Sequence, residues 1–252
     1  AAAITTSDWL IQTAQTQAGL FQPVYDIDDG RFFESDKEWS MSSGSYHVKI
    51  AIGLLNLYDL TENKRYLNAA TKVCDITLGY QLTSGRYISF LSKGGTNVHP
   101  HCYTAEGLWV AGKFLKRDDY LDSSAKGIKW LLNLQNSDGV IPRLYFDDKP
   151  VYHERIDAIA QTVRMAIIHI VEKRLDSCYY SHIEKLISLM LKYQVKEGNK
   201  HELGGIYWGK TSNGKIMGHP NSWVTAFSIQ ALMIHEDYLE NNKLDLNLFH
   251  IV

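Results

Sequence analysis

The chain has little of what usually builds a disulfide framework or a cysteine metal cluster. Its 252 residues include three cysteines, Cys74, Cys102 and Cys178, which are widely spaced and form no CxxC pair. An odd and dispersed set argues against disulfides and against a thiolate metal site. We therefore predict free, buried thiols in a reducing compartment and a cytoplasmic location, although a signal peptide that had already been removed would leave no trace.

The sequence also lacks long apolar runs, an excess of one charge, and common catalytic and nucleotide-binding motifs. No uninterrupted apolar stretch approaches the ~18 residues of a membrane-spanning helix. The formal net charge is −2, which gives neither the basic footprint of a nucleic-acid-binding protein nor a polybasic membrane surface. There is no GxSxG, P-loop or dinucleotide fingerprint. We expect no nucleic-acid partner, no membrane partner and no cofactor, and the oligomeric state is left open.

Two short segments could suggest a metal, but they match no ligand pattern well. The acidic turn at residues 26–30 lacks the twelve-residue spacing and the closing glutamate of a calcium loop. His99 and His101 lie two residues apart and have no third ligand at a useful spacing. We expect no metal site.

What the chain does contain is a repeat. A tyrosine is followed fifteen residues later by a glutamine and four residues after that by a glycine, in three copies: Tyr66/Gln81/Gly85, Tyr120/Gln135/Gly139 and Tyr179/Gln194/Gly198. Gln15 and Gly19 form a partial fourth copy. A period above 50 residues fits two long helices plus a long loop. The Gln-x-x-x-Gly units are read as helix ends, with glutamine in the last turn and glycine as the C-terminal cap.

Apolar spacing predicts helices joined by two kinds of connection. The helices are expected over residues 6–18, 44–60, 63–82, 101–116, 118–136, 153–174, 177–195 and 221–235, with another starting within 236–246. Short polar turns at 61–63, 116–118 and 235–237 favour antiparallel pairs. The long connections 20–43, 83–100, 137–152 and 196–220 are rich in glycine and aromatic residues, and long loops are usually functional. We predict one all-α domain over residues 1–252, with the long loops at one end.

Polar side chains gather where the first helix of each pair begins. His47, His101 and His219 lie beside three of these starts, and helix N-termini favour anionic or polar ligands. Gln161 and Arg164 lie on an otherwise apolar segment, where an unsatisfied polar group is costly. Two structural readings stay open. Polar helix starts are common as caps, and histidines in register could repeat one packing role.

The candidate residues fall into two sets. Those that could transfer protons are Glu106, Asp157, His101, His47 and Tyr103. Those that could bind a substrate through stacking, charge or hydrogen bonds are Trp39, Tyr46, Lys49, Arg143, Tyr145, Glu154, Arg155, Gln161, Arg164, His219, Asn221 and Trp223.

The repeated helix ends resemble those of the (α/α) toroids. The segments are Trp130-Leu131…Gln135…Gly139 and Tyr193-Gln194…Gly198, and the alternation of short and long connections is similar too. The pattern looks like the six-hairpin glycosidase superfamily, which includes unsaturated glucuronyl hydrolases; polysaccharide lyases and uronyl C5-epimerases are related toroids. We count about four and a half hairpins, within an expected range of four to six, so the ring could be incomplete.

This resemblance implies a saccharide bound at the long-loop end between aromatic side chains. We expect a carbohydrate-active enzyme for an acidic, uronate-containing saccharide, most simply a glycoside hydrolase, which needs two carboxyl groups ~5–9.5 Å apart. A uronyl lyase or C5-epimerase would instead need a His or Tyr base. A non-catalytic saccharide-binding or scaffold toroid is the third alternative. No family's catalytic motif matches residue by residue.

Overall fold

The computed structural model describes residues 1–211, 213–241 and 244, and it folds as two compact units. The first unit is Ala1–Gly127 and the second is Ile128–Leu246, so that the boundary falls within one helix. The expectation of a single domain stays a prediction. Among the described residues, no helix is long and apolar enough to cross a bilayer.

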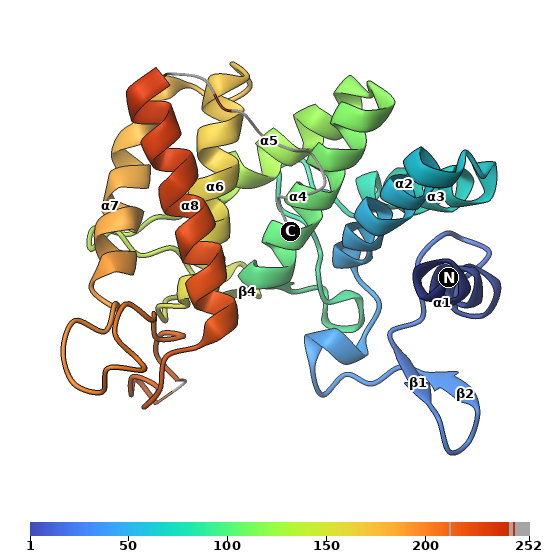
Figure 1. The fold of residues 1–252 in the computed structure, drawn as a ribbon, viewed down its shortest axis with the longest axis horizontal. Helices are drawn as coiled ribbons and strands as arrows, with labels where there is room; N and C mark the ends of the chain where they lie inside the picture. The colour runs from blue at the N-terminus through green and yellow to red at the C-terminus, as the bar shows by residue number, and fades with distance from the viewer. Residues whose placement is uncertain (212, 242–243, 245–252) are drawn as a thin grey trace. The chain divides into compact units, whose positions relative to one another are not determined.

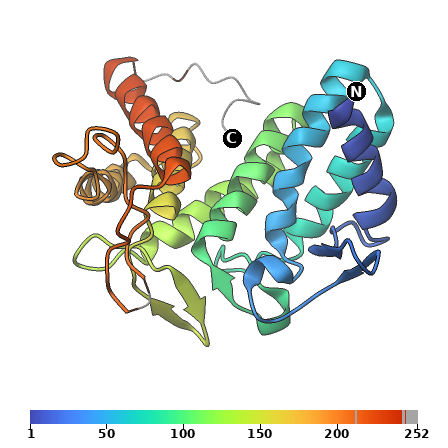
Figure 2. The same ribbon diagram turned by 60° about the horizontal axis from the view of Figure 1, so that its bottom comes forward.

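The first unit contains two complete inner helices and the outer elements around them (Figures 1 and 2). Its elements, in chain order, are α1 (Ala2–Trp9), the π-helix η1 (Leu10–Ala14), β1 (Val24–Asp26), β2 (Arg31–Phe33), η2 (Trp39–Met41), η3 (Ser45–Lys49), α2 (Ile50–Thr61), α3 (Lys64–Leu78), η4 (Leu91–Lys93), β3 (Thr96–Asn97), α4 (Val98–Leu115) and the start of α5 (Asp118–Asn133). The strands β1 and β2 form an antiparallel hairpin inside the first long loop.

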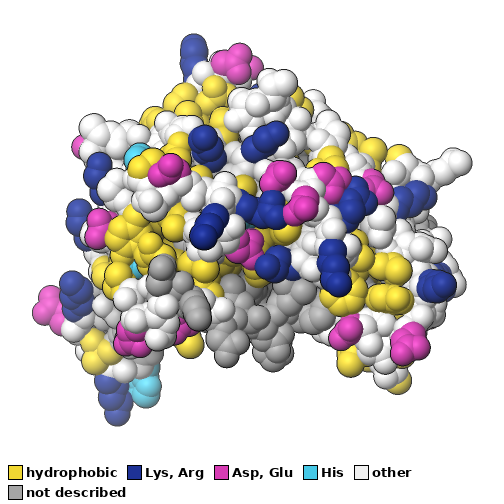
Figure 3. All heavy atoms as spheres, turned by 90° about the horizontal axis from the view of Figure 1, so that it is seen from above, with side chains coloured by type: hydrophobic (Ala, Val, Ile, Leu, Met, Phe, Trp, Pro, Cys, Tyr) yellow, Lys and Arg dark blue, Asp and Glu magenta, His cyan; other side chains and the backbone are white. Residues whose placement is uncertain are grey.

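The second unit repeats the same plan. It contains the end of α5, the antiparallel hairpin of β4 (Leu144–Phe146) and β5 (Lys149–Val151), then α6 (Ile156–Val171), η5 (Ser177–Tyr179), α7 (Tyr180–Leu191) and α8 (Ser222–Asn241). α6 packs against both α7 and α8. Acidic and basic side chains are interspersed over the face seen in Figure 3.

Burial distinguishes inner from outer helices. Nearly every residue of α4 from Val98 to Gly112 and every residue of α6 from Ile156 to Ile170 is buried. In contrast, α3 and α7 each bury one stripe, as expected of amphipathic helices at a surface. The predicted short turns at 61–63 and 116–118 are confirmed. They are made by Glu62 and Lys116 in left-handed conformation, and Asn63 caps α3 by accepting a hydrogen bond from the backbone N–H of Arg65.

The predicted turn at 235–237 is wrong, because α8 continues without a break to Asn241. No proline or glycine interrupts this stretch, and α7 supports it. The hydroxyl of Tyr180 lies 2.8 Å from His235 Nε2, and the Tyr180 ring packs against that of Tyr238. The rest of the expected helix at 236–246 lies mostly outside the described residues.

The glutamine repeat joins one outer element to the next. The side-chain Nε2 of Gln81 donates to the carbonyls of Gly85 (3.0 Å) and Ser123 (2.8 Å). Gln15 makes the same pair of bonds, to the carbonyls of Gly19 (3.1 Å) and Ala69 (2.9 Å). Gln135 makes them to the carbonyls of Gly139 (3.0 Å) and His182 (3.1 Å). Each of these three glutamines therefore holds its own turn and joins it to the following outer helix.

The position of these residues differs from the prediction. α3 ends at Leu78 and α5 at Asn133, so Gln81 and Gln135 lie just beyond the helices and not in their last turns. Gly85 and Gly139 have φ of 98° and 82°, in the tight turn that follows. A positive φ favours glycine there, although the residue is not the helix cap.

Candidate functional site

In the first unit, two long loops meet where the inner helices begin. The backbone N–H of Ser45 donates to the carbonyl of Ile88 (3.3 Å), and that of Leu91 donates to Ser43 (3.2 Å). These bonds place the start of η3 beside the loop that leads into α4. Residues from both loops can therefore contribute to one surface.

A buried ion pair lies at this point. Lys49 Nζ, on η3, is 2.9 Å from Glu106 Oε2, on α4. The Glu106 side chain is fully buried and that of Lys49 is 18% exposed. The same ammonium lies 4.2 Å from the centre of the Tyr103 ring, in a cation–π contact. The predicted residues Lys49, Tyr103 and Glu106 are thus neighbours.

Aromatic rings surround the ion pair. Tyr46 packs edge-on against Trp39 (5.1 Å between centroids) and against His47 (4.5 Å). His99 lies 4.4 Å from the Tyr103 ring and 6.1 Å from Trp39. His99 was considered only as a weak metal ligand in the sequence, yet it belongs to this cluster, which we call the unit 1 cluster: Trp39, Tyr46, His47, Lys49, His99, Tyr103 and Glu106.

Burial shifts the pKa of two members of the cluster. It lowers the pKa of His47 to about 4, so the ring is neutral at pH 7. Burial, together with the charge of Glu34, raises the pKa of Tyr46 well above its usual range. A neutral imidazole can accept a proton, whereas Tyr46 remains a hydrogen-bond donor at any ordinary pH.

His101 has a structural role. Its ring is fully buried, its Nδ1 accepts from the backbone N–H of Tyr87 (3.4 Å) and its Nε2 donates to the carbonyl of Gly127 (3.0 Å). Desolvation lowers its pKa to about 4. Because both ring nitrogens are bonded to backbone groups, we leave His101 out of the proposed site.

In the second unit, the start of α6 is paired with the last long loop. The backbone N–H of Lys210 donates to the carbonyl of Glu154 (2.9 Å), and that of Ile156 donates to Trp208 (3.0 Å). Gly209 lies between, with φ of 126°, and a side chain there would meet the Glu154 carbonyl at 2.2 Å. The close approach of these two segments therefore requires glycine at this position.

Two guanidinium groups and an indole ring form the centre of this region. Arg143 and Arg155 each lie 4.9 Å from the centre of the Trp208 ring. Glu154 Oε1 is 2.6 Å from Lys210 Nζ. Burial opposes ionisation of Glu154, but the hydrogen bond and charge of Lys210 outweigh it and lower the pKa of the carboxyl group. We call Arg143, Glu154, Arg155, Asp157, Trp208 and Lys210 the unit 2 cluster.

Asp157 is held in the charged form by its neighbours. Arg155 binds it bidentately, with Nε 2.8 Å from Oδ1 and Nη2 3.0 Å from Oδ2, and the backbone N–H of Ala158 also donates to Oδ1 (2.8 Å). All three donors favour the carboxylate over the acid. Asp157 is therefore better suited to accept a proton or to attack as a nucleophile than to donate a proton.

The remaining predicted residues of this unit lie elsewhere. Gln161 and Arg164 are fully buried within α6, and Arg164 bonds to Gln230 and lies 5.2 Å from the Phe227 ring, both on α8. Tyr145 packs on Trp130. Three predicted residues lie around the start of α8. The Asn221 side chain caps the helix by accepting a hydrogen bond from the backbone N–H of Val224. Trp223 and His219 are both exposed.

Trp208 and Lys210 were missed by the sequence analysis. They lie in the loop 196–220, which has no helical or strand periodicity to orient a side chain. The available signal was an aromatic residue beside a glycine in a long connection, Trp208-Gly209. It indicates a close backbone approach, but not which segment approaches.

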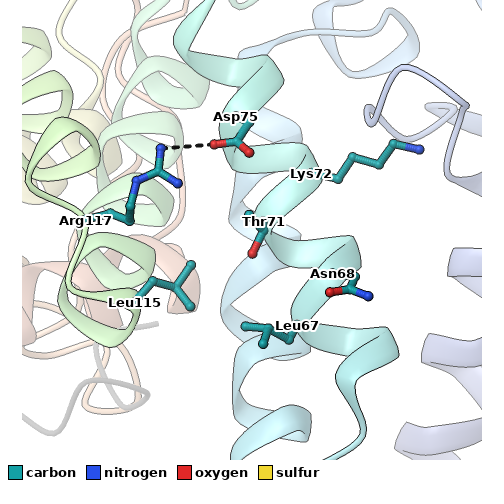
Figure 4. Close-up of a pocket in the computed structure, with 7 residues that line it drawn as sticks. All are labelled: Leu67, Asn68, Thr71, Lys72, Asp75, Leu115 and Arg117. Carbon is teal, nitrogen blue, oxygen red and sulfur yellow. Dashed lines mark hydrogen bonds and ion pairs between the residues drawn. The ribbon is translucent and has the colours of Figure 1, made fainter.

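The pocket drawn in Figure 4 lies along α3 and the α4–α5 turn of the first unit, and none of its lining residues belongs to either cluster. Its polar groups already join helices. Arg117 Nη2 is 3.3 Å from Asp75 Oδ1, and Asp75 also accepts from the Tyr120 hydroxyl. This pocket therefore belongs to the outer-helix packing.

Solved structures with similar folds identify the architecture. An unsaturated glucuronyl hydrolase from Bacillus sp. GL1 aligns over 95% of this chain and 68% of its own, with 16% identity and a TM-score of 0.67. A D-mannose isomerase aligns over 96% and 65%, with 15% identity and a TM-score of 0.71. The chain has the α/α-toroid fold.

The range of chemistry among similar structures is wide. A polysaccharide lyase aligns over 81% of this chain and 63% of its own, with 16% identity and a TM-score of 0.61. This chain thus spans about two thirds of the length of each of these proteins. No protein-family model matches the sequence, and no curated protein matches it either.

Proposed function

We propose that this protein is a carbohydrate-active enzyme that acts on an acidic, uronate-containing saccharide. The observation that carries the proposal is the unit 2 cluster, where the guanidinium groups of Arg143 and Arg155 lie against the Trp208 ring. A flat indole surface stacks on the apolar face of a sugar ring. Cations beside it favour a carboxylate substituent on that sugar.

The residues of the unit 2 cluster take different roles. Trp208 provides the stacking surface, and Arg143 and Lys210 attract the uronate. Arg155 is a positioning residue, because its bidentate bond sets the orientation of Asp157. Asp157, held as a carboxylate, acts as the base or nucleophile.

Hydrolysis is the reaction we favour, since hydrolases of unsaturated uronides are among the proteins with this fold. A lyase or C5-epimerase reaction is the second candidate, and one observation favours it. His47 is neutral at pH 7, and Tyr103 lies directly under the Lys49 ammonium. A histidine and a tyrosine beside a cation are the residue types that a lyase or epimerase would use to transfer a proton next to a carboxylate.

Incubation with uronate oligosaccharides tests both reactions at once. New reducing ends without a change in ultraviolet absorbance would indicate hydrolysis of saturated substrates. Loss of absorbance from unsaturated substrates would indicate hydrolysis of unsaturated uronides, and a gain would indicate elimination. Inversion at C5, followed by NMR, would indicate epimerisation. Binding without any product would support a saccharide-binding toroid and contradict the enzyme proposal.

Two variants test the assigned residues. Asp157→Asn should lower kcat by at least about 100-fold, as expected for loss of a base or nucleophile. Arg143→Met should mainly raise KM for uronates and leave neutral sugars unaffected. The matched control is Asp138→Asn, in an exposed turn of the same unit, which should keep full activity. Retained activity in Asp157→Asn would remove it from the mechanism.

A further inference from the structure

The first long loop of unit 1 is closed by a carboxylate. Glu34 follows β2 directly, and its side chain accepts hydrogen bonds from the backbone N–H of Ser43 (3.3 Å) and from the Ser43 hydroxyl. The backbone N–H of Ser35 donates to the carbonyl of Met41 (2.8 Å). These bonds join the two ends of residues 34–43, which we call the 34–43 loop, and η2 lies between the joined ends.

The C-terminal end of the 34–43 loop is fixed to the rest of the unit. The Tyr46 hydroxyl donates to the Ser42 carbonyl (2.9 Å), and the Ser42 hydroxyl donates to that of Ser92 (3.2 Å). Burial and the charge of Glu34 raise the pKa of Tyr46 well above its usual range, so this hydroxyl keeps the proton that it donates. Glu34 therefore ties the N-terminal end of the loop to an end that is already anchored.

The loop carries Trp39, a partly exposed ring that is held from two sides. Its centre lies 5.1 Å from that of Tyr46 and 6.1 Å from that of His99. Trp223, in contrast, is 56% exposed and packs on Phe227 of its own helix. An indole offers a large apolar surface for stacking, and a ring that is already fixed loses little conformational freedom when a ligand binds. Trp39 is therefore the better prepared of these two rings for stacking.

We propose that the 34–43 loop presents Trp39 as a stacking surface for a pyranose ring, and that Glu34 is the positioning residue that keeps the indole in place. Glu34 acts through Ser43 and the loop, and we assign it no direct contact with the sugar. The inference concerns the first unit by itself. It rests on the proposed function in one respect, because it requires that the protein bind a saccharide.

Amide hydrogen exchange followed by mass spectrometry tests the closure of the loop without a ligand. Glu34→Gln replaces one acceptor oxygen by an NH₂ group, so peptides covering the 34–43 loop should exchange about 10-fold faster than in the unmodified protein. Ser43→Ala, which removes the hydroxyl donor, should also speed exchange. The matched control is Glu38→Gln, the same change at an exposed position of the loop, which should not. Unchanged exchange in Glu34→Gln would overturn the proposal.

Calorimetric titration with uronate oligosaccharides tests the link between Glu34 and the indole. Trp39→Ala should weaken binding by about 10-fold or more, and Glu34→Gln by about 5-fold. Trp39→Phe, which keeps a smaller ring, should weaken it less than Trp39→Ala. In the double variant, Glu34→Gln should cause no further loss beyond that of Trp39→Ala, because its effect is transmitted by the indole.

The outcomes separate this inference from the proposed function. Saccharide binding that is unaffected by Trp39→Ala would overturn the stacking role and leave the proposed function standing. Additive losses in the double variant would mean that Glu34 does not act through Trp39, and would also overturn the inference alone. Failure of the unmodified protein to bind any saccharide would overturn both.

Discussion

Removing the side chain of Gln81 should destabilise the first unit by an amount that can be worked out from its bonds. Nε2 donates to the carbonyls of Gly85 and Ser123, and Oε1 accepts from the Ser123 hydroxyl, at 3.0, 2.8 and 2.9 Å. A net contribution of ~1 kcal/mol per hydrogen bond gives about 3 kcal/mol for Gln81→Ala. For a protein of this size, that corresponds to a fall in Tm of about 6–12 °C.

A second substitution tests whether stability depends on the hydrogen bonds that Gln81 donates or only on the space that its side chain fills. Gln81→Glu keeps the shape and can still accept from the Ser123 hydroxyl, but its carboxylate would face the carbonyl oxygens of Gly85 and Ser123. It should therefore be at least as destabilising as Gln81→Ala at pH 7. Part of the loss should be recovered as the pH falls and the carboxyl group gains a proton that it can donate.

Urea unfolding followed by far-ultraviolet circular dichroism measures these effects. The matched control is Gln22→Ala, which removes a single exposed bond to the Thr13 carbonyl (3.3 Å) and should cost less than about 0.5 kcal/mol. If Gln81→Ala and Gln22→Ala prove equally mild, the glutamine repeat does not clip the outer helices together, and our explanation of the repeat fails.

Two further changes test the buried histidines and the repeated glycine. Burial lowers the pKa of His47, His101 and His169 to about 4, 4 and 3 from 6.5. The unfolded chain therefore binds more protons than the folded one below pH 6.5, and the free energy of unfolding should fall between pH 6.5 and 4 by up to about 1.4 kcal/mol per pH unit for each histidine. Equal stability at pH 7 and pH 5 would contradict their neutral burial. Gly139→Ala forces a side chain into φ of 82°, with Lys185 Cβ at 3.1 Å, and should cost about 1–3 kcal/mol in urea unfolding. Gly53→Ala, within α2 and with open space around it, should instead be neutral or stabilising, so a similar effect of both would refute the conformational argument.

Local pattern was enough to predict the helices and their pairing. The apolar spacing of α4 and α6 and the short turns at Glu62 and Lys116 depend on residues close together in the chain, and the structure follows them. The error at 235–237 has the same origin. A polar His-Glu-Asp stretch resembles a turn in the sequence, whereas contacts of Tyr180 with His235 and Tyr238, which come from α7, keep it helical.

Prediction of the candidate site was less complete. The pairing of Lys49 with Glu106 and of Arg155 with Asp157 involves residues that were predicted, because polar groups at a helix start are visible in the sequence. Which of these residues pair with each other was not predicted. Which charge neutralises which, and that two guanidinium groups lie against the Trp208 ring, depends on how segments far apart in the sequence come together.

By itself, then, the amino-acid order determined the alternation of inner and outer helices, since it arises from a repeated local pattern. The sequence also showed the glutamine repeat, but the tertiary structure decided which backbone carbonyl each glutamine reaches, because those partners lie 42–54 residues away. Only the tertiary structure decided which polar side chains face a common surface and which are used in packing. His101 illustrates this, because its ring nitrogens are occupied by the backbone of Tyr87 and Gly127. The physical reason is that long loops carry no periodicity, so their long-range hydrogen bonds settle where their side chains lie.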